Sequence, residues 1–243
     1  MAVEKGLPFR PAQYAERMVV TAILDGTFPP GSVLPSERVF AEELGVTRPT
    51  LREILQRLAS EGWITIHHGK QTVVNNYWKE GGLRLLSTTA KYGDILSREF
   101  ITNLLEVRVN LLPPVAKKAV ENSPDALLEY LGKSRELKDD PEAFARYDWG
   151  LQVLIARESQ NPIYLLILND FTDIFRLMAP TYFNSRTGRK ASRRYYQKLF
   201  DAIRNGGNCI EDIVREALET SIHIWEELAR TQEVYNGALE RMG

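Results

Sequence analysis

One stretch of the sequence combines side chains that could read DNA with a spacing that would expose them together. Between residues 47 and 58, Arg48, Arg52 and Gln56 recur every four residues. A helix would therefore carry them on one outward face. Guanidinium and amide groups can pair with base edges when such a face enters a major groove. A merely solvated helix face is the alternative interpretation, since charged faces are common on helices.

Further donors flank this stretch. Arg38 lies on the preceding predicted helix, and His68, Gly69 and Lys70 lie at a predicted hairpin tip, where glycine allows close approach to a groove. We predict that Arg48 reads a guanine and that Lys70 contacts phosphate. The predicted DNA-binding residues are Arg38, Thr47, Arg48, Pro49, Thr50, Arg52, His68, Gly69 and Lys70.

Two short helices, a tight turn and a hairpin must position these side chains. Ser36 can cap the first helix, and Gly45 can end it with a positive φ. Thr47 can cap the second helix, which Gly62 ends. The predicted buried face of that second helix is Leu51, Ile54, Leu55 and Leu58. The apolar period then changes from 3.6 to 2 in residues 63–66 and 71–74, which predicts a hairpin and hence a winged helix-turn-helix.

Three segments carry a family resemblance. LPSER (34–38), GVTRPTLREILQRLASEGW (45–63) and HHGK (67–70) resemble the signature of the GntR family of transcription regulators. The resemblance implies a winged helix that binds double-stranded operator DNA, an all-helical effector domain and a homodimer. Such a dimer would read a palindrome with half-sites about one helical turn apart.

Composition limits the possible partners and compartment. The chain carries 31 Lys and Arg against 32 Asp and Glu, and residues 1–78 carry eight of each, so DNA binding must depend on local cations. The single cysteine, Cys209, excludes an internal disulfide and suits a reducing compartment. No signal peptide and no apolar run of membrane-spanning length is recognisable, so we expect a cytoplasmic protein.

Helical patterns fill the chain beyond Gly82. Helices are predicted at 83–91, 95–112, 124–138, 141–159, 162–183, 190–204 and 209–230, and we expect Pro113 and Pro114 to kink or restart the second of them. Short connections between helices predict an antiparallel bundle, which can hold a ligand between facing helices. We therefore predict a mostly α protein with a DNA-binding domain at 1–78 and an all-α effector-binding and dimerisation domain at 79–243.

Catalysis and metal binding have little support. Past the hairpin the only histidine is His223, and no phosphate loop or nucleophile elbow is present, so we do not expect an enzyme. Many GntR-family effector domains hold a metal with one Asp and three His. The matching positions here are Asp148, Gln152, Tyr196 and Leu218, of which leucine cannot ligate and Gln and Tyr replace imidazole poorly. We expect no metal and no other cofactor.

The resemblance extends through NNYW (75–78), LLEVRVNL (104–111), NPIYLLILN (161–169) and Tyr182-Phe183 to one branch of the family, which controls fatty-acid metabolism. The effector of that branch is a long-chain fatty acyl-CoA, whose binding releases DNA. The matching effector-binding residues are Arg108, Tyr182, Ser221 and Trp225.

Some features of the second half leave alternatives open. Arg108 could receive the anionic ligand or form a salt bridge with Asp148. Leu218 and Ala217 stand where this branch has a Gly and a Tyr. This difference favours the alternative, a regulator that responds to another small carboxylate or acyl thioester. A basic run without acids, from Arg186 to Lys198, is either a solvated face or an attractor for the phosphates of CoA.

Overall fold

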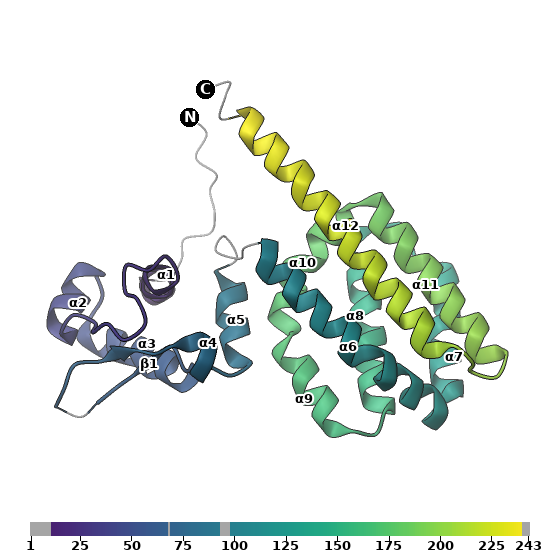
Figure 1. Cartoon of the computed structure of the whole chain (residues 1–243), viewed down its shortest axis with the longest axis horizontal. Helices are drawn as coiled ribbons and strands as arrows, with labels where there is room; N and C mark the ends of the chain where they lie inside the picture. Colours follow the sequence, from purple (N-terminus) through teal and green to yellow (C-terminus); the bar gives the residue numbers. More distant parts are fainter. Residues whose placement is uncertain (1–10, 68, 93–97, 240–243) are drawn as a thin grey trace. The chain divides into compact units, whose positions relative to one another are not determined.

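The computed structural model describes residues 11–67, 69–92 and 98–239, except for the side chains of residues 98 and 231–239. The backbone forms two compact units, Met1–Ile95 and Leu96–Gly243. The first unit combines helices with one two-stranded antiparallel sheet, and the described part of the second is entirely helical (Figure 1). The predicted fold class, a winged helix-turn-helix followed by an all-α bundle, is confirmed.

The first unit has the expected order of a winged helix. Its elements are α1 (Pro11–Leu24), α2 (Glu37–Glu43), α3 (Arg48–Glu61), β1 (Ile64–Thr65), β2 (Val73–Val74), α4 (Tyr77–Glu80) and α5 (Arg84–Lys91). The four apolar residues predicted for the inner face of α3 are all buried, and they pack with Val19 and Ile23 of α1 and with Phe40 of α2. Burial of this helical stripe fixes which side of α3 faces solvent.

The caps of the two central helices differ from each other. Thr47 caps α3, since its Oγ1 accepts a hydrogen bond from the Thr50 amide at 3.3 Å, and Gly62 ends the helix at φ 97°. Ser36 occupies the N-cap position of α2, but its side chain makes no capping hydrogen bond, so that expected cap is absent. Of these two helices, α3 alone is therefore stabilised by a capping side chain.

The hairpin is shorter than predicted. Antiparallel pairing covers Ile64 with Val74 and Thr65 with Val73, and Val33 adds an isolated bridge to Val73. Trp63 and Ile64 are buried, and the outer residues of the predicted strands extend toward the wing without ladder pairing. The extra bridge ties the segment before α2 to the base of the wing.

Helix α5 is fastened within the first unit by carboxylates. Glu16 of α1 is 1% exposed and accepts hydrogen bonds from Arg57 of α3 and, at 2.9 Å, from Lys91 of α5. At the end of α3, Glu61 accepts a hydrogen bond from Thr88 of α5. A buried carboxylate is tolerated when cations satisfy it in this way. These contacts group α5 with the winged helix, whereas our domain border was drawn after residue 78.

The second unit is a bundle of antiparallel helices. Its elements are α6 (Arg98–Asn122), α7 (Pro124–Gly132), a 3₁₀ turn η2 (Lys133–Glu136), α8 (Pro141–Glu158), α9 (Pro162–Asp170), α10 (Thr172–Asn184), α11 (Arg186–Arg204) and α12 (Ile210–Leu239). The long helices α6 and α12 lie side by side, and α11 packs along α12 (Figure 1). Among the described residues, no helix is long and apolar enough to span a membrane.

The helices predicted at 95–112 and 162–183 differ from their predicted limits. Helix α6 continues through Pro113 and Pro114, although neither can donate to the preceding turn. The Val109 carbonyl, which Pro113 leaves without its usual partner, instead accepts a hydrogen bond from Arg215 of α12 at 3.4 Å. The single helix predicted at 162–183 is interrupted at Phe171 and forms the separate helices α9 and α10.

Candidate functional site

The outward face of α3 is the first candidate site. Thr47, Arg48, Pro49 and Arg52 are exposed at its N-terminal end. Thr50 is partly exposed, and its hydroxyl lies 2.9 Å from that of Thr47. The N-terminus of a helix favours negatively charged groups, because its free amides and dipole point outward. The arrangement therefore offers cations and hydroxyls to a phosphate or a base edge.

The three arginines near this face differ in their partners. Arg52 forms a two-point ion pair with Glu37, with its Nη2 at 2.6 Å from Oε2, and this guanidinium lowers the pKa of Glu37. Arg38 pairs with Glu42 at 3.2 Å on the exposed surface of α2. Within the described residues Arg48 forms no ion pair. Arg48 is thus the arginine whose guanidinium is available without breaking an existing contact.

The wing presents the remaining predicted DNA contacts. Gly69 adopts φ 70°, and a β-carbon there would meet no atom within 4 Å. Lys70 is exposed, and its amide donates to the His67 carbonyl at 3.3 Å to close the turn. His68, which we predicted to contact DNA, lies outside the described residues. The positive φ of Gly69 is one that L-residues rarely adopt, which explains why a glycine stands at residue 69.

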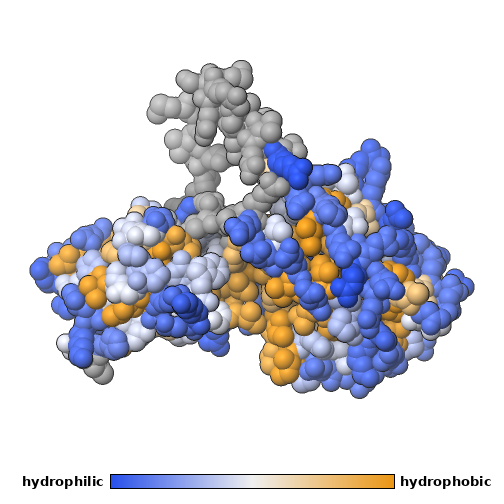
Figure 2. Space-filling model, in the orientation of Figure 1, coloured by the Kyte–Doolittle hydropathy of each residue, from blue (hydrophilic) through white to orange (hydrophobic). Residues whose placement is uncertain are grey.

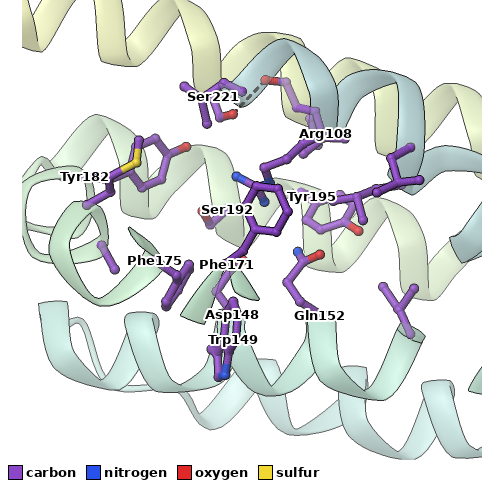
Figure 3. A pocket seen from close by; sticks show the side chains of 18 of the residues that line it. Arg108, Asp148, Trp149, Gln152, Phe171, Phe175, Tyr182, Ser192, Tyr195 and Ser221 are labelled. Atoms are coloured by element: carbon purple, nitrogen blue, oxygen red, sulfur yellow. Dashed lines mark hydrogen bonds between the residues drawn. The ribbon is translucent and has the colours of Figure 1, made fainter. Parts of the chain in front are cut away.

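The second candidate site is a cavity of about 230 Å³ within the helical unit, and Figure 3 shows side chains that line it. Helices α6 and α8 to α12 all contribute to its walls. The four predicted effector-binding residues, Arg108, Tyr182, Ser221 and Trp225, all line it. The structure thus brings together residues that are more than a hundred positions apart in the sequence.

Arg108 and Asp148 place opposite charges on the cavity wall, which also carries Arg194, Lys198 and Glu216. Burial raises the pKa of Asp148, while the field of Arg108 and hydrogen bonds from Tyr196 and Gln152 oppose the rise. The Tyr196 hydroxyl donates to Oδ1 of Asp148 at 2.9 Å. In the described part of the chain no carboxylate lies within ion-pair distance of Arg108. Its interaction with Asp148 is therefore through space, and the guanidinium is free to face a ligand.

Aromatic and hydroxyl groups surround this charge. The rings of Tyr182 and Trp225 are stacked with centroids 6.5 Å apart, and burial raises the pKa of Tyr182 to about 12. The Ser221 hydroxyl donates to the Leu218 carbonyl at 2.6 Å, which keeps it local to α12. Leu218 and Ala217, which depart from the family pattern, also line the cavity, and Leu218 is 8% exposed.

The positions that match the metal ligands of related domains also converge. Asp148, Gln152 and Tyr196 are joined by hydrogen bonds, and Leu218 borders the same cavity. One carboxylate, an amide and a phenol make a poor donor set for a transition metal, which prefers imidazole or thiolate. The polar side chains instead donate hydrogen bonds to the carboxylate of Asp148.

Much of the cavity wall escaped the sequence-based prediction. Trp149 of α8 and Phe175 of α10 pack with centroids 4.7 Å apart, and Phe171, Ile167 and Met178 complete an apolar side of the cavity. No local period distinguishes a cavity wall from an ordinary core. One signal in the sequence is the density of apolar residues in 163–183. In the structure α9, which lies in this range, has no fully buried residue.

Comparisons with known proteins match both parts of the chain. The model of "Bacterial regulatory proteins, gntR family" matches residues 11–74, and that of "FadR C-terminal domain" matches residues 75–234. A protein of Shewanella sp. (strain ANA-3), named fatty acid metabolism regulator protein, is 43% identical over 189 residues, or 78% of each chain. Its namesake in Erwinia tasmaniensis is 40% identical over 216 residues, 88% of this chain and 91% of its own.

One solved structure has a similar fold. The structure of Lar, described as controlling the expression of the Listeria monocytogenes agr system, has a TM-score of 0.57 and 16% identity. The match covers 94% of this chain and 99% of that one. At this identity the similarity concerns the fold alone.

Proposed function

The chain belongs to the GntR family of bacterial transcription regulators, its residues 75–234 match the FadR C-terminal domain, and we propose how it works. Residues 1–78 bind operator DNA, and residues 79–243 bind the effector and hold two copies together as a homodimer. A long-chain fatty acyl-CoA enters the cavity and stabilises a conformation that releases the DNA. Relatives named as fatty acid metabolism regulators support a role in fatty-acid metabolism.

The exposed N-terminal end of α3 supports the DNA-binding half of the proposal. Arg48 reads a guanine there, and Arg52 exchanges Glu37 for a phosphate or a base. Lys70 on the wing contacts the phosphate backbone. Since Arg38 and Arg52 already hold carboxylates, their net contribution to DNA affinity is smaller than that of Arg48.

One observation supports the effector half above all others. Arg108 faces a largely apolar cavity without a carboxylate at ion-pair distance among the described residues. A cation without an ion-pair partner in such surroundings is costly unless a ligand or solvent satisfies it. An amphiphile with a polar, oxygen-rich head and a long apolar tail fits this distribution of charge and apolar wall.

The test is a titration of acyl-CoAs of increasing chain length against the protein bound to operator selected from random DNA. We expect long chains to weaken operator binding and to raise the melting temperature of the free protein. Arg108→Ala should lose the ligand without unfolding, and Leu218→Gly should tighten it. Calorimetry that detects no binding for any chain length, in either wild type or Leu218→Gly, would overturn the acyl-CoA assignment.

A second candidate effector is another small carboxylate or acyl thioester. Leu218 favours it, because its side chain fills part of the cavity that the corresponding Gly of the branch leaves open. Organic acids and short acyl thioesters belong in the same titration. A short ligand that releases operator when long-chain acyl-CoA does not would establish this alternative.

A further inference from the structure

The basic run of α11 separates into two sets of side chains. Its members are Arg186, Arg189, Lys190, Arg193, Arg194 and Lys198, and no acidic residue lies between Asp173 and Asp201. Hydrophilic side chains cover much of the visible face over α11 and α12 (Figure 2). Which of these cations remain available depends on the contacts that each already makes.

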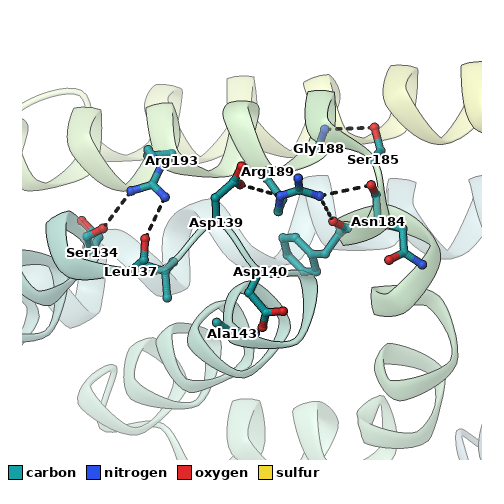
Figure 4. Close-up of polar contacts among 11 residues, drawn as sticks. Ser134, Leu137, Asp139, Asp140, Ala143, Asn184, Ser185, Gly188, Arg189 and Arg193 are labelled. Carbon is teal, nitrogen blue, oxygen red and sulfur yellow. Dashed lines mark hydrogen bonds and ion pairs between the residues drawn. The ribbon is translucent and has the colours of Figure 1, made fainter.

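Two arginines of the run hold the bundle together (Figure 4). Arg189 donates to Asp139 at 2.6 Å and to the carbonyls of Phe183 and Asn184, which end α10. Arg193 donates to the carbonyls of Ser134 at 3.3 Å and Leu137 at 2.9 Å. Cations at helix ends satisfy carbonyls that have no partner within their own helix. Both arginines therefore stabilise the fold through contacts within the bundle.

Lys198 is also engaged, but at the cavity. Its Nζ lies 2.6 Å and 2.7 Å from the two carboxylate oxygens of Glu216, and both residues line the cavity wall. This pair is partly exposed, so its contribution to stability is small. Because Lys198 already holds Glu216, that acid is only partly available to neutralise Arg194 nearby.

The remaining cations form a stripe, defined here as Arg186, Lys190 and Arg194. They are spaced by four residues and lie on one face of α11, about 6 Å apart at each step. All three are exposed, and in the part of the chain that is described none makes an ion pair or hydrogen bond. Like charges one turn apart destabilise a helix, so the stripe does not serve the stability of α11.

The stripe ends at the cavity. Arg194 is exposed and also lines the cavity, beside Lys198. An anionic group bound along the stripe would therefore be continuous with a ligand inside the bundle. Guanidinium and ammonium groups both bind phosphate, arginine through two parallel hydrogen bonds.

We propose that the stripe binds the phosphates of a phosphorylated acyl ligand, the nucleotide end of acyl-CoA, while the acyl chain occupies the cavity. This rests on the proposed function for the acyl chain. It adds the stripe, which lies outside the four predicted effector-binding residues, as the site of the phosphates of the ligand. Several phosphates on one flexible headgroup match several cations spaced along one helix.

The experiment compares two ligands that differ in their phosphates. Palmitoyl-CoA and S-palmitoyl-pantetheine, which lacks phosphate, are titrated below their micelle concentrations into wild type and Lys190→Ala/Arg194→Ala. The matched control is Lys118→Ala/Lys133→Ala, which removes the same charge from exposed pairs outside the cavity wall. Free CoA is titrated into all three proteins to test the stripe without an acyl chain.

We expect the stripe variant to bind palmitoyl-CoA about tenfold more weakly, since two exposed ion pairs are lost. Its affinity for S-palmitoyl-pantetheine should be unchanged, and the control should match wild type. An unchanged affinity for palmitoyl-CoA, or an equal loss for both ligands, would overturn the proposal. If neither palmitoyl ligand binds wild type, the acyl-CoA function fails, and the titration with free CoA then tests the stripe by itself. Weaker binding of free CoA to the stripe variant than to the control supports phosphate binding by the stripe. Equal binding to both proteins, or no binding, overturns phosphate binding by the stripe.

Discussion

At the scale of single residues, the availability of a side chain matters more than its type. Three arginines surround the exposed end of α3, but Arg38 and Arg52 hold carboxylates and Arg48 does not pair within the described residues. A free guanidinium can approach a base edge without first losing a partner. This difference assigns separate roles to chemically identical side chains.

Arg48→Ala should therefore cost about 1–3 kcal/mol of operator binding and relax the preference at one base pair. Lys70→Ala on the wing should instead weaken binding to all sequences and reduce the salt dependence by about one phosphate contact. Binding of operator and single-base variants across a range of salt concentrations separates the two effects. If Arg48→Ala keeps both its affinity and its base preference, α3 does not read DNA as proposed.

Asp148 makes stability depend on pH in a predictable direction. Burial raises its pKa in the folded protein above the unfolded value of about 3.9. The folded state then binds the proton more tightly, so this contribution to the free energy of unfolding is full below that value and is lost as pH rises through the folded pKa.

Asp148→Asn removes this titration. Urea unfolding between pH 4 and pH 8 should show that the stability of the variant, relative to wild type, increases with pH and then levels off. A difference that is constant across the range would mean that Asp148 has the same pKa in both states.

At the scale of elements, α3 depends on its cap. Thr47 accepts the Thr50 amide, whereas Ser36 occupies the N-cap position of α2 without a capping hydrogen bond. Thr47→Ala should lower the free energy of unfolding by about 1 kcal/mol, and Ser36→Ala should change it by less than about 0.5 kcal/mol. Urea unfolding of the full chain measures both, and equal effects would contradict the difference in capping.

At the scale of the whole molecule, the proposed function requires reciprocal coupling between effector and DNA. If palmitoyl-CoA weakens operator binding by some factor, operator must weaken palmitoyl-CoA binding by the same factor, commonly about 5- to 150-fold in allosteric proteins. Calorimetry with palmitoyl-CoA in the presence and absence of saturating operator tests this equality. An unchanged affinity for palmitoyl-CoA would show that release does not arise from equilibrium coupling.

Local patterns determined the elements of this protein. The apolar spacing of Leu51, Ile54, Leu55 and Leu58 predicted which face of α3 is buried, and Thr47 and Gly62 predicted where that helix begins and ends. Such signals depend on residues within a few positions of each other, where backbone geometry is regular. The family resemblance then selected the positions of Arg108, Tyr182, Ser221 and Trp225, which periodicity alone could not separate from core.

Tertiary structure decided which of these groups are free to act. Arg52 donates to Glu37, which is 15 positions away, and Arg189 donates to Asp139, which is 50 positions away. Arg215 donates to the Val109 carbonyl, which Pro113 leaves without its helical partner. The cavity likewise exists only because α6 and α8 to α12 leave space between them. Hydrogen bonds and cavities between distant segments depend on how whole helices pack, and no local spacing of residues encodes that packing.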